Sequence, residues 1–251
     1  MHACLAETMN HSLINLDSLQ VVLDQHRDKL NRFAELLIAE NQKYNLTRID
    51  SPQQVEVRHF LDSLAGLSVL DALSQKTGKP LQVLDIGSGA GFPGLVLAVV
   101  RPAWQIVSLE ATEKKANFQK MVCDTLGLEN TTLLNGRAEA IAHLAQFRQV
   151  FDVVTARALA AMPVLTELSL GYVKINGLGL YWKGPSAKEE LTTAQAAIKQ
   201  MGGEIEQTLP YTLQTGGSEP AKLSLVVCKK IKPTPQEYPR AFGIIKRKPL
   251  S

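Results

Sequence analysis

The sequence has few cysteines and no long hydrophobic run, and each absence excludes a class of protein. Its three cysteines, Cys4, Cys123 and Cys228, are widely separated and form no C-x-x-C pair, which argues against a zinc knuckle and a disulfide framework. We therefore expect no metal site, and thiols that are buried or idle. No stretch approaches the roughly eighteen consecutive apolar residues of a membrane span, so no membrane partner is expected.

The amino-terminal stretch MHACLAETMNHSL also lacks the features of an export signal. It has neither a basic segment nor a continuous apolar segment, and both are needed in a secretory signal peptide. The sequence therefore predicts a cytoplasmic protein. With 251 residues, of which 45% are hydrophobic, the chain can bury a substantial core, and we expect one globular, monomeric unit of enzyme size.

Positive charge is concentrated at the carboxyl end of the chain. Residues 228–251 hold seven basic side chains against one acidic side chain, a balance of +6, whereas the remaining residues have a balance of −3. A basic tail on a slightly acidic body favours a polyanionic partner, although a solvated terminus explains the same charges. Four prolines disfavour a long helix, so we expect an extended strap along a nucleic-acid backbone. The alternative is that Tyr238, Pro239 and Phe242 pack on the body.

Helical periodicity dominates the first third of the chain. Between residues 16 and 44 apolar side chains recur at steps of three, four and seven, which predicts an amphipathic helical region with at most one break. A second helical stretch is expected after Ser51-Pro52, because serine caps a helix and proline suits its first turn. The linker QKTGKP ends this part, so we expect an amino-terminal helical cap at residues 1–80.

Beyond Pro80 short apolar runs alternate with helical segments. Strands are predicted at 82–86, 105–110, 131–135, 151–155, 178–182 and 224–228, and helices are predicted to begin near Phe92, Thr112, Ala138, Ala160 and Ser186. This alternation predicts an α/β core at residues 81–230, a doubly wound and mostly parallel sheet covered on both faces, followed by the basic tail at 231–251. Ligands of such sheets bind at the carboxyl ends of the strands.

A glycine-rich loop, VLDIGSGAGFPGL at residues 83–95, can be read in two frames. Starting at Gly89 it spells the dinucleotide motif G-x-G-x-x-G, but that frame begins three residues too late after the strand. It also leaves Asp85 near a phosphate, which at about 4 Å and an effective dielectric of 20 costs about 4 kcal/mol. Starting at Gly87, the loop suits a ligand with a cationic sulfonium and no phosphate, such as S-adenosylmethionine.

Glu110, at the end of the second predicted strand, supports either nucleotide-like ligand, because a carboxylate there accepts hydrogen bonds from both ribose hydroxyls. A Walker loop is excluded, since the residue after Gly94 is leucine where that motif needs lysine. Any single glycine of the loop could be purely structural, allowing a tight turn or close helix packing. Taken with Glu110, however, the aspartate and the glycines of the loop favour a cofactor site over a bare strand–helix turn.

Four motifs together resemble one family. They are YNLT at 44–47, RHFLDSL at 58–64, DIGSGAGFPG at 85–94 and YPRAFGIIKRKPL at 238–250. They are similar, in this order, to the RsmG family, also called GidB, and the resemblance covers roughly residues 30 to 250. That family comprises methyltransferases acting on N7 of a guanine in 16S ribosomal RNA near the decoding centre. The resemblance implies a class I, Rossmann-like methyltransferase sheet, S-adenosylmethionine as cofactor, and 16S rRNA or the small ribosomal subunit as partner.

The resemblance also implies which residues bind the cofactor. They follow the first, third and fourth strands: Gly87, Phe92, Ala138, Glu139 and Arg157. Glu110 occupies the family's acidic position, although the usual Asp-Ser is Glu110-Ala111 here and the usual Ser-Arg-Ala is Ala156-Arg157-Ala158. Ala138 and Glu139 also suit an ordinary first helical turn, where the helix dipole favours a glutamate.

Several charged residues are candidates for contacts to the substrate. Arg157, at the end of a buried strand, needs an anionic or carbonyl partner, and we expect it to serve the site more than the fold. His59 and Asp62 lie one helical turn apart and either face the site or pair on the cap. Lys183, after the fifth strand, and Arg247, in the tail, are candidates for binding RNA, with simple solvation as the alternative for each.

The implied reaction requires no catalytic acid or base. Guanine N7 carries an in-plane lone pair and no proton, so it attacks a sulfonium methyl directly. Alignment within about 3 to 3.5 Å can then supply roughly 7 to 11 kcal/mol of the barrier, and carbonyls or a carboxylate near the ring would stabilise its developing positive charge. Two alternatives remain at this point: a methyltransferase of a small molecule or protein, and a non-catalytic RNA-binding module with the same fold.

Overall fold

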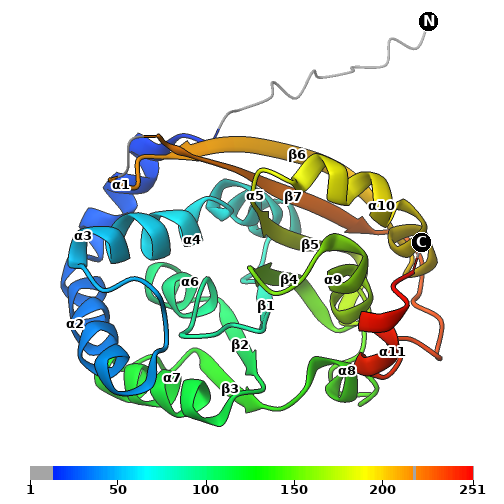
Figure 1. Ribbon diagram of the computed structural model, residues 1–251, viewed down its shortest axis with the longest axis horizontal. Helices are drawn as coiled ribbons and strands as arrows, with labels where there is room; N and C mark the ends of the chain where they lie inside the picture. Colours follow the sequence, from blue (N-terminus) through cyan, green and yellow to red (C-terminus); the bar gives the residue numbers. More distant parts are fainter. Residues whose placement is uncertain (1–13, 217–218, 251) are drawn as a thin grey trace, which may run out of the picture.

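The computed structural model describes residues 14–216 and 219–250, and its centre is one seven-stranded sheet (Figure 1). The strands are β1 Gln82–Ile86, β2 Gln105–Glu110, β3 Thr131–Asn135, β4 Phe151–Arg157, β5 Val173–Lys183, β6 Gly203–Leu213 and β7 Ala221–Lys230. Their order across the sheet is β3-β2-β1-β4-β5-β7-β6. Strands β1 to β5 run parallel, whereas β7 is antiparallel to both β5 and β6. The prediction of a mostly parallel α/β sheet is confirmed.

Helices cover both faces of this sheet. They are α1 Leu16–Gln25, α2 Arg27–Tyr44, α3 Pro52–Val55, the π-helix η1 Glu56–Leu61, α4 Asp62–Leu64, α5 Leu67–Thr77, α6 Gly94–Val100, α7 Glu113–Leu126, α8 Ala138–Ile141, α9 Met162–Ser169, α10 Ala187–Gln200 and α11 Phe242–Arg247. In Figure 1, α2, α6 and α7 lie on one side of the sheet and α8, α9 and α11 on the other. Because both faces are covered, the central strands β1 and β4 are almost continuously buried.

The helices begin and break at the residues predicted from the sequence. The amphipathic region at 16–44 is broken once, at His26, between α1 and α2. Ser51 caps α3 by accepting a hydrogen bond from the Gln54 amide, and Pro52 occupies the first turn. Helices α7 and α10 begin directly after Thr112 and Ser186. These element predictions are confirmed.

Strand β6 was not predicted from the sequence. Its residues, GEIEQTLPYTL, contain two glutamates and a proline, and its burial alternates instead of being continuous. Proline within a strand is tolerated at a sheet edge, and β6 is an edge strand that pairs only with β7. The apolar-run criterion that found the buried parallel strands therefore could not find this half-exposed antiparallel one.

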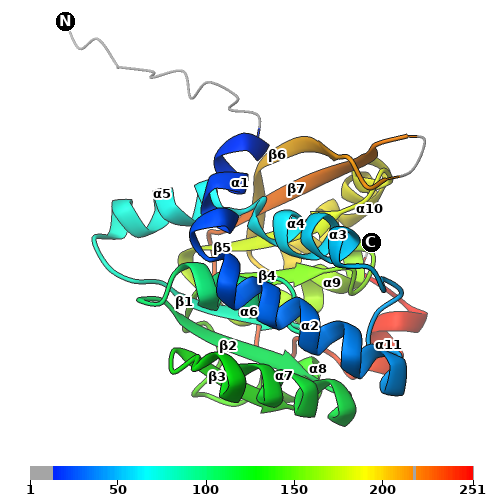
Figure 2. The ribbon, with the colours of Figure 1, turned by 90° about the vertical axis from the view of Figure 1, so that its left-hand side faces the viewer.

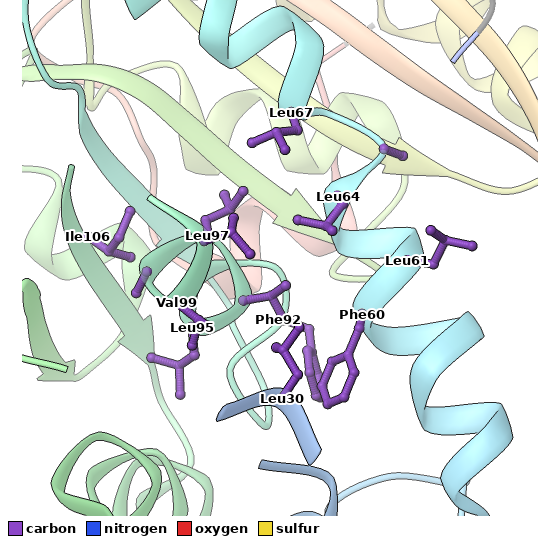
Figure 3. Packing of buried hydrophobic residues seen from close by; sticks show 14 of the residues in the cluster. Leu30, Phe60, Leu61, Leu64, Leu67, Phe92, Leu95, Leu97, Val99 and Ile106 are labelled. Carbon is purple, nitrogen blue, oxygen red and sulfur yellow. The ribbon is translucent and has the colours of Figure 1, made fainter. Parts of the chain in front are cut away.

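The helices before β1 share one hydrophobic core with α6, α7 and the sheet. Figure 2 shows α1 and α2 crossing the face of the sheet that α6 and α7 also cover. Phe92, in the loop before α6, stacks on Phe33 of α2 at a ring-centroid distance of 5.2 Å, and Phe60 of η1 lies 6.1 Å away. Figure 3 shows Phe60 and Phe92 meeting beside Leu30. The helical cap therefore fixes the loop that follows β1.

The carboxyl-terminal tail packs on the body of the protein. The prediction of an extended strap is therefore wrong for most of the tail. Ile245 of α11 is fully buried, and Tyr238 and Phe242 pack against the core between the sheet and α9. Arg240 forms a bidentate ion pair with the buried Glu167 of α9. Lys230, also fully buried, donates to the Leu170 carbonyl at 2.9 Å and to the Met201 carbonyl at 2.5 Å. Two of the seven basic side chains thus serve the fold, and a third, Lys229 of β7, pairs with Glu206 of β6 at 3.9 Å.

The remaining sequence expectations concern thiols and metals. Burial raises the pKa of the Cys123 thiol to about 11 and that of Cys228 to about 12, so both are protonated at neutral pH. Cys4 lies outside the described residues. Within the described ranges no group of three or more histidine, cysteine, aspartate or glutamate side chains is placed to hold a metal ion. No helix in this part of the chain is both long and apolar enough to cross a membrane.

Candidate functional site

A pocket of about 530 Å³ opens at the carboxyl ends of β1, β4 and β5, where the helical cap meets the sheet. The glycine loop after β1 forms its floor, residues 87–90. The lining also includes His59 and Asp62 from the cap, Arg157 at the end of β4 and Lys183 at the end of β5. Four of the sequence-predicted site segments, far apart in the chain, are therefore brought together.

The glycine loop is folded tightly under the pocket. Gly87 and Gly89 have φ angles of +62° and +60°, which glycine adopts without strain. A Cβ at Gly87 would clash with the side chain of Leu159, whereas a Cβ at Gly89 would meet nothing within 4 Å. The backbone at Gly89 therefore borders open space, and a ligand can approach it closely.

Most amides at the start of α6 are already engaged within the loop. The amides of Gly91 and Phe92 donate to the Ser88 carbonyl, and the amide of Leu95 donates to the Gly91 carbonyl. Residue 93 is proline, and the amide of Gly94 donates to the carboxylate of Asp85 at 2.8 Å. A pyrophosphate-binding loop needs such amides pointing at the ligand. The loop geometry thus disfavours the dinucleotide frame and favours the frame that begins at Gly87.

Asp85 itself does not reach the pocket, which corrects the expectation that it faces a cationic ligand. Its side chain is fully buried and accepts hydrogen bonds from the Gly94 amide and from the Thr155 hydroxyl, the latter at 2.9 Å. Burial raises the pKa of this carboxyl to about 7, because desolvation outweighs the two hydrogen bonds. Asp85 therefore stabilises the glycine loop. Its position at the strand end was predicted correctly, whereas the direction of its side chain was not.

Glu110 connects the glycine loop to the end of β2. One carboxylate oxygen accepts from the Gly89 amide at 2.9 Å, and the other accepts from the Thr112 amide at 2.7 Å. Each oxygen retains a further lone pair, so the carboxylate can still accept hydrogen bonds from a diol. Its position beside Gly89 suits the ribose of a nucleoside.

Ala138 and Glu139 lie in the first turn of α8, after β3, and do not line this pocket. The Ala138 carbonyl accepts a hydrogen bond from the Tyr172 hydroxyl at 2.5 Å. Glu139 pairs with Arg137 at 3.3 Å. Both residues follow the carboxyl end of β3, as Glu110 stands at the carboxyl end of the neighbouring β2, so they lie one strand further from the pocket.

Arg157 is the centre of a hydrogen-bonded cluster that joins β4 to the cap. Its Nη1 donates to the Arg58 carbonyl at 2.7 Å and to Asp62 Oδ2 at 2.8 Å. Its Nη2 donates to His59 Nδ1 at 2.9 Å, and the guanidinium lies 5.2 Å from the centre of the Phe92 ring. Arg157 thus has both the carbonyl and the anionic partner that its position requires, and the cap supplies them.

His59 is held neutral by this arrangement. Since Nδ1 accepts from Arg157, the proton lies on Nε2, which donates to the Thr47 hydroxyl at 2.9 Å. Burial and the positive charge of Arg157 lower the pKa of the imidazole to about 3. The ring also stacks on Phe92 at a centroid distance of 4.3 Å. Both ring nitrogens are therefore used to fix the side chain.

Asp62 extends the cluster to the far end of the sheet. Its Oδ1 accepts a hydrogen bond from the Tyr211 hydroxyl of β6 at 2.6 Å, and its main-chain carbonyl accepts from the Trp182 indole at 2.6 Å. Tyr211 was not predicted as a site residue because strand β6 was not predicted. Trp182 was not predicted because a tryptophan in a buried strand is expected to pack in the hydrophobic core. His59 and Asp62 flank the junction of η1 with α4, and π-helical turns of this kind are frequent at functional sites.

Lys183 is not free to bind RNA, and that expectation is wrong. Its ammonium group pairs with Glu190 of α10 at 2.6 Å and donates to the Ala160 carbonyl at 2.9 Å. Glu190 also accepts from the Met162 amide, so the pair holds the segment between β4 and α9. Ala158, in that segment, has a φ of +53°, which an alanine adopts only under constraint. The strong ion pair supplies such a constraint.

Arg247 lies at the end of α11 and does not line the pocket. Its side chain is exposed, as are those of Lys246 and Lys248 beside it. No carboxylate of residues 14–216 or 219–250 forms an ion pair with these three side chains. They remain available to a polyanion, although on a surface separate from the pocket wall.

Comparisons with known proteins identify the family of this chain. Residues 26–215 match the GidB family model, described as rRNA small subunit methyltransferase G. The ribosomal RNA small subunit methyltransferase G of Lactococcus lactis subsp. lactis is 38% identical over 227 residues, which cover 90% of this chain and 92% of the relative. The protein of that name from Carboxydothermus hydrogenoformans is 40% identical over 219 residues, 87% of this chain and 89% of the relative.

A solved structure of a protein described as a transferase, from Pyrococcus horikoshii, has a TM-score of 0.52 and 15% sequence identity. The match covers 72% of this chain and 65% of the solved chain. At 15% identity it shows a similar fold only. The family match spans the glycine loop, the cap residues of the pocket and the Arg157 cluster. The chain therefore belongs to the GidB family, rRNA small subunit methyltransferase G.

Proposed function

We propose that this protein is an S-adenosylmethionine-dependent methyltransferase that methylates N7 of a guanine in 16S rRNA, in the small ribosomal subunit near the decoding centre. The observation that carries the proposal is the convergence of three of the family's four motifs on one pocket. His59 and Asp62 of the cap meet Phe92 of the glycine loop and Arg157 of β4 at distances of 2.8 to 5.2 Å. Thr47 fixes His59 through a hydrogen bond of 2.9 Å. Residues 81–230 would form the catalytic core, and residues 1–80 the cap.

The residues present fit S-adenosylmethionine. The open face at Gly89 admits a ligand against the backbone, and the Glu110 carboxylate beside it can accept the ribose hydroxyls. The engaged amides of Gly91, Phe92 and Gly94 suit a cofactor without phosphate. Gly87 and Phe92 would contact the methionine end, and Ala138 with Glu139, one strand further along, would contact the adenine end. The bound cofactor would supply an electrophilic methyl group.

The chain's own side chains would contribute alignment without a general base. His59 has a pKa of about 3 and both ring nitrogens engaged, so it is neither basic nor free. The Asp62 carboxylate accepts from Arg157 and Tyr211. Neither group is available to remove a proton, which is consistent with a nucleophile such as guanine N7 that carries none. Their rigid hydrogen bonds would instead fix the pocket wall in one geometry.

Two further attributes belong to the same proposal. An enzyme of ribosomal RNA works where the small subunits are, so we place the protein in the cytoplasm. We also propose that it acts as a monomer, since the pocket of the single chain contains both the loop and the cap residues. Light scattering after gel filtration should give a mass near 27.5 kDa.

The experiment that tests the function offers labelled S-adenosylmethionine with four separate acceptors: small ribosomal subunits, naked 16S rRNA, bulk cytoplasmic protein and a metabolite extract. Label should enter the ribosomal acceptor and saturate near one methyl group per subunit. Label in protein or metabolites, with none in the ribosomal RNA, would favour a methyltransferase of another substrate. RNA binding without any transfer would favour a non-catalytic module.

A further inference from the structure

An exposed aromatic side chain that the proposed chemistry does not use lies two residues before the pocket lining. Tyr44 is the last residue of α2, and 47% of its surface is exposed. In the described part of the chain it is the only exposed aromatic side chain, since the other phenylalanines, tyrosines and tryptophans are buried or half-buried. An exposed ring close to a functional pocket is free to stack on a planar partner.

The chain fixes Tyr44 at the rim through its neighbours. Asn45 adopts a left-handed conformation with φ of 50° and ends α2, and the next two residues, Leu46 and Thr47, line the pocket. Since consecutive Cα atoms are about 3.8 Å apart, the Cα of Tyr44 lies within about 8 Å of that of Leu46. The carbonyl of Tyr44 accepts a hydrogen bond from Lys114 of α7 at 2.9 Å, which ties the end of α2 to the neighbouring helix.

Two cations on the pocket wall also lack a partner within the fold. Arg58 and Lys115 line the pocket. Among the described residues neither forms an ion pair, whereas the other two pocket cations do: Arg157 pairs with Asp62, and Lys183 pairs with Glu190. An uncompensated arginine and lysine in one opening attract a polyanion and cannot be explained by the internal network.

We propose that Tyr44, Arg58 and Lys115 form an RNA-binding rim for the single strand that flanks the target guanine. Tyr44 provides the face on which the base of a neighbouring nucleotide stacks, and Arg58 and Lys115 bind the phosphates of the same strand. Proteins that recognise unpaired RNA combine these two elements, aromatic faces for bases and cations for the backbone. The inference rests on the proposed function, because it takes RNA as the substrate of this pocket.

The aromatic part of the rim is tested with Tyr44→Leu and Tyr44→Phe. Leucine keeps an apolar side chain but removes the π face, whereas phenylalanine keeps the ring. Stacking on one base predicts that Tyr44→Leu weakens binding of unmethylated small subunits, and of a fluorescein-labelled single-stranded oligoribonucleotide, about 5- to 100-fold. Tyr44→Phe should recover affinity to within about threefold of the wild type. The KM for S-adenosylmethionine and the melting temperature should stay at wild-type values in both variants.

The cationic part is tested by the salt dependence of oligoribonucleotide binding. Each phosphate contact to a single strand contributes about 0.7 to the slope of log affinity against log salt, so Arg58→Gln with Lys115→Gln should flatten it by about 1.4. The matched control is Lys76→Gln. Lys76 is exposed and lies near the end of α5, which precedes β1. It is therefore on the side of the amino-terminal strand ends, away from the pocket, and its loss should leave the slope unchanged.

Equal RNA affinity of Tyr44→Leu and Tyr44→Phe would overturn the stacking role, and an unchanged slope in the double glutamine variant would overturn the phosphate contacts. Loss of subunit binding by Tyr44→Leu with normal oligoribonucleotide binding would assign Tyr44 to a protein contact and also overturn the rim. Should the wild type methylate no RNA yet bind it through Tyr44, the proposed function would fail and the rim would stand. The two ideas are therefore separable.

Discussion

Replacing Arg157 with alanine removes the connection between β4 and the helical cap. Three acceptors lose their donor at once: the Arg58 carbonyl, Asp62 Oδ2 and His59 Nδ1. The side chains of Arg157 and Asp62 are only 14% and 12% exposed, so the pair is largely desolvated. Removing one partner of such a pair costs about 3 to 5 kcal/mol, because the other charge stays buried and unpaired. For a chain of this size that corresponds to a fall of roughly 6 to 20 °C in melting temperature.

This value revises the expectation from the sequence that Arg157 serves the site more than the fold. The matched control is Arg101→Ala, which breaks a bidentate ion pair with Asp71 of α5 that is 28% and 33% exposed and lies away from the pocket. Because this pair keeps more contact with solvent than the Arg157 pair, its loss should cost less, about 1 kcal/mol, and the control should melt within a few degrees of the wild type. Arg157→Lys keeps the charge but not the planar fork, and it should fall between the wild type and Arg157→Ala.

Scanning calorimetry of the four proteins measures the stability, and methyl transfer to small subunits at 20 °C, where all should remain folded, measures the activity. Arg157→Ala should lose at least tenfold in rate, because the pocket wall formed by His59 and Asp62 is no longer held against Phe92. Equal melting temperatures for Arg157→Ala and Arg101→Ala would refute the reasoning. So would full activity of Arg157→Ala at a temperature where it is folded.

Three further outcomes are expected. The first concerns pH. The unfolding free energy contributed by neutral His59 is lost as pH falls from 6.5 towards 3, because the unfolded chain binds the proton first. The contribution of protonated Asp85 is lost as pH rises from 3.8 towards 7, and each loss is about 1.4 kcal/mol per pH unit. In urea titrations between pH 4.5 and 6.5, unfolding free energy should therefore fall with pH in His59→Gln and rise with pH in Asp85→Asn; matching profiles would contradict both pKa shifts. Second, Gly87→Val should abolish S-adenosylmethionine binding in calorimetry, since valine at φ of +62° clashes with Leu159 and distorts the loop; normal binding would exclude that loop frame. Third, changing residues 246–248 to glutamine should flatten the salt slope of ribosomal RNA binding by about two to three units and leave cofactor affinity unaltered; an unaltered slope would limit the tail to packing.

The parallel part of the fold follows from the sequence because burial on both faces produces continuous apolar runs. Strands β1 to β4 begin at the residues predicted, and Ser51, Thr112 and Ser186 mark their helices correctly. Strand β6 does not follow, because an edge strand with a proline and two glutamates has no such run. The tail does not follow either, since its burial depends on Glu167 and Met201, which are distant in sequence.

The site was predictable at the level of segments and not at the level of side-chain direction. Position at a strand end identified Asp85, Glu110 and Arg157 as a group. It could not show that Asp85 points beneath the loop, or that Lys183 is already paired with Glu190, because both depend on partners from other elements. Periodicity likewise cannot reveal Tyr211, whose hydroxyl reaches Asp62 across 149 positions of sequence.

The central claim is that the pocket methylates N7 of a guanine in 16S rRNA. The most direct measurement incubates small ribosomal subunits that lack the modification with the protein and S-adenosylmethionine, digests the 16S rRNA to nucleosides, and quantifies methylated species by mass spectrometry. The account predicts 7-methylguanosine approaching one per subunit, formed at a single-turnover rate that stays nearly level from roughly pH 6 to 9 because no base must be deprotonated. A methyl group on another base or ring position, or a rate that rises tenfold per pH unit across that range, would contradict it.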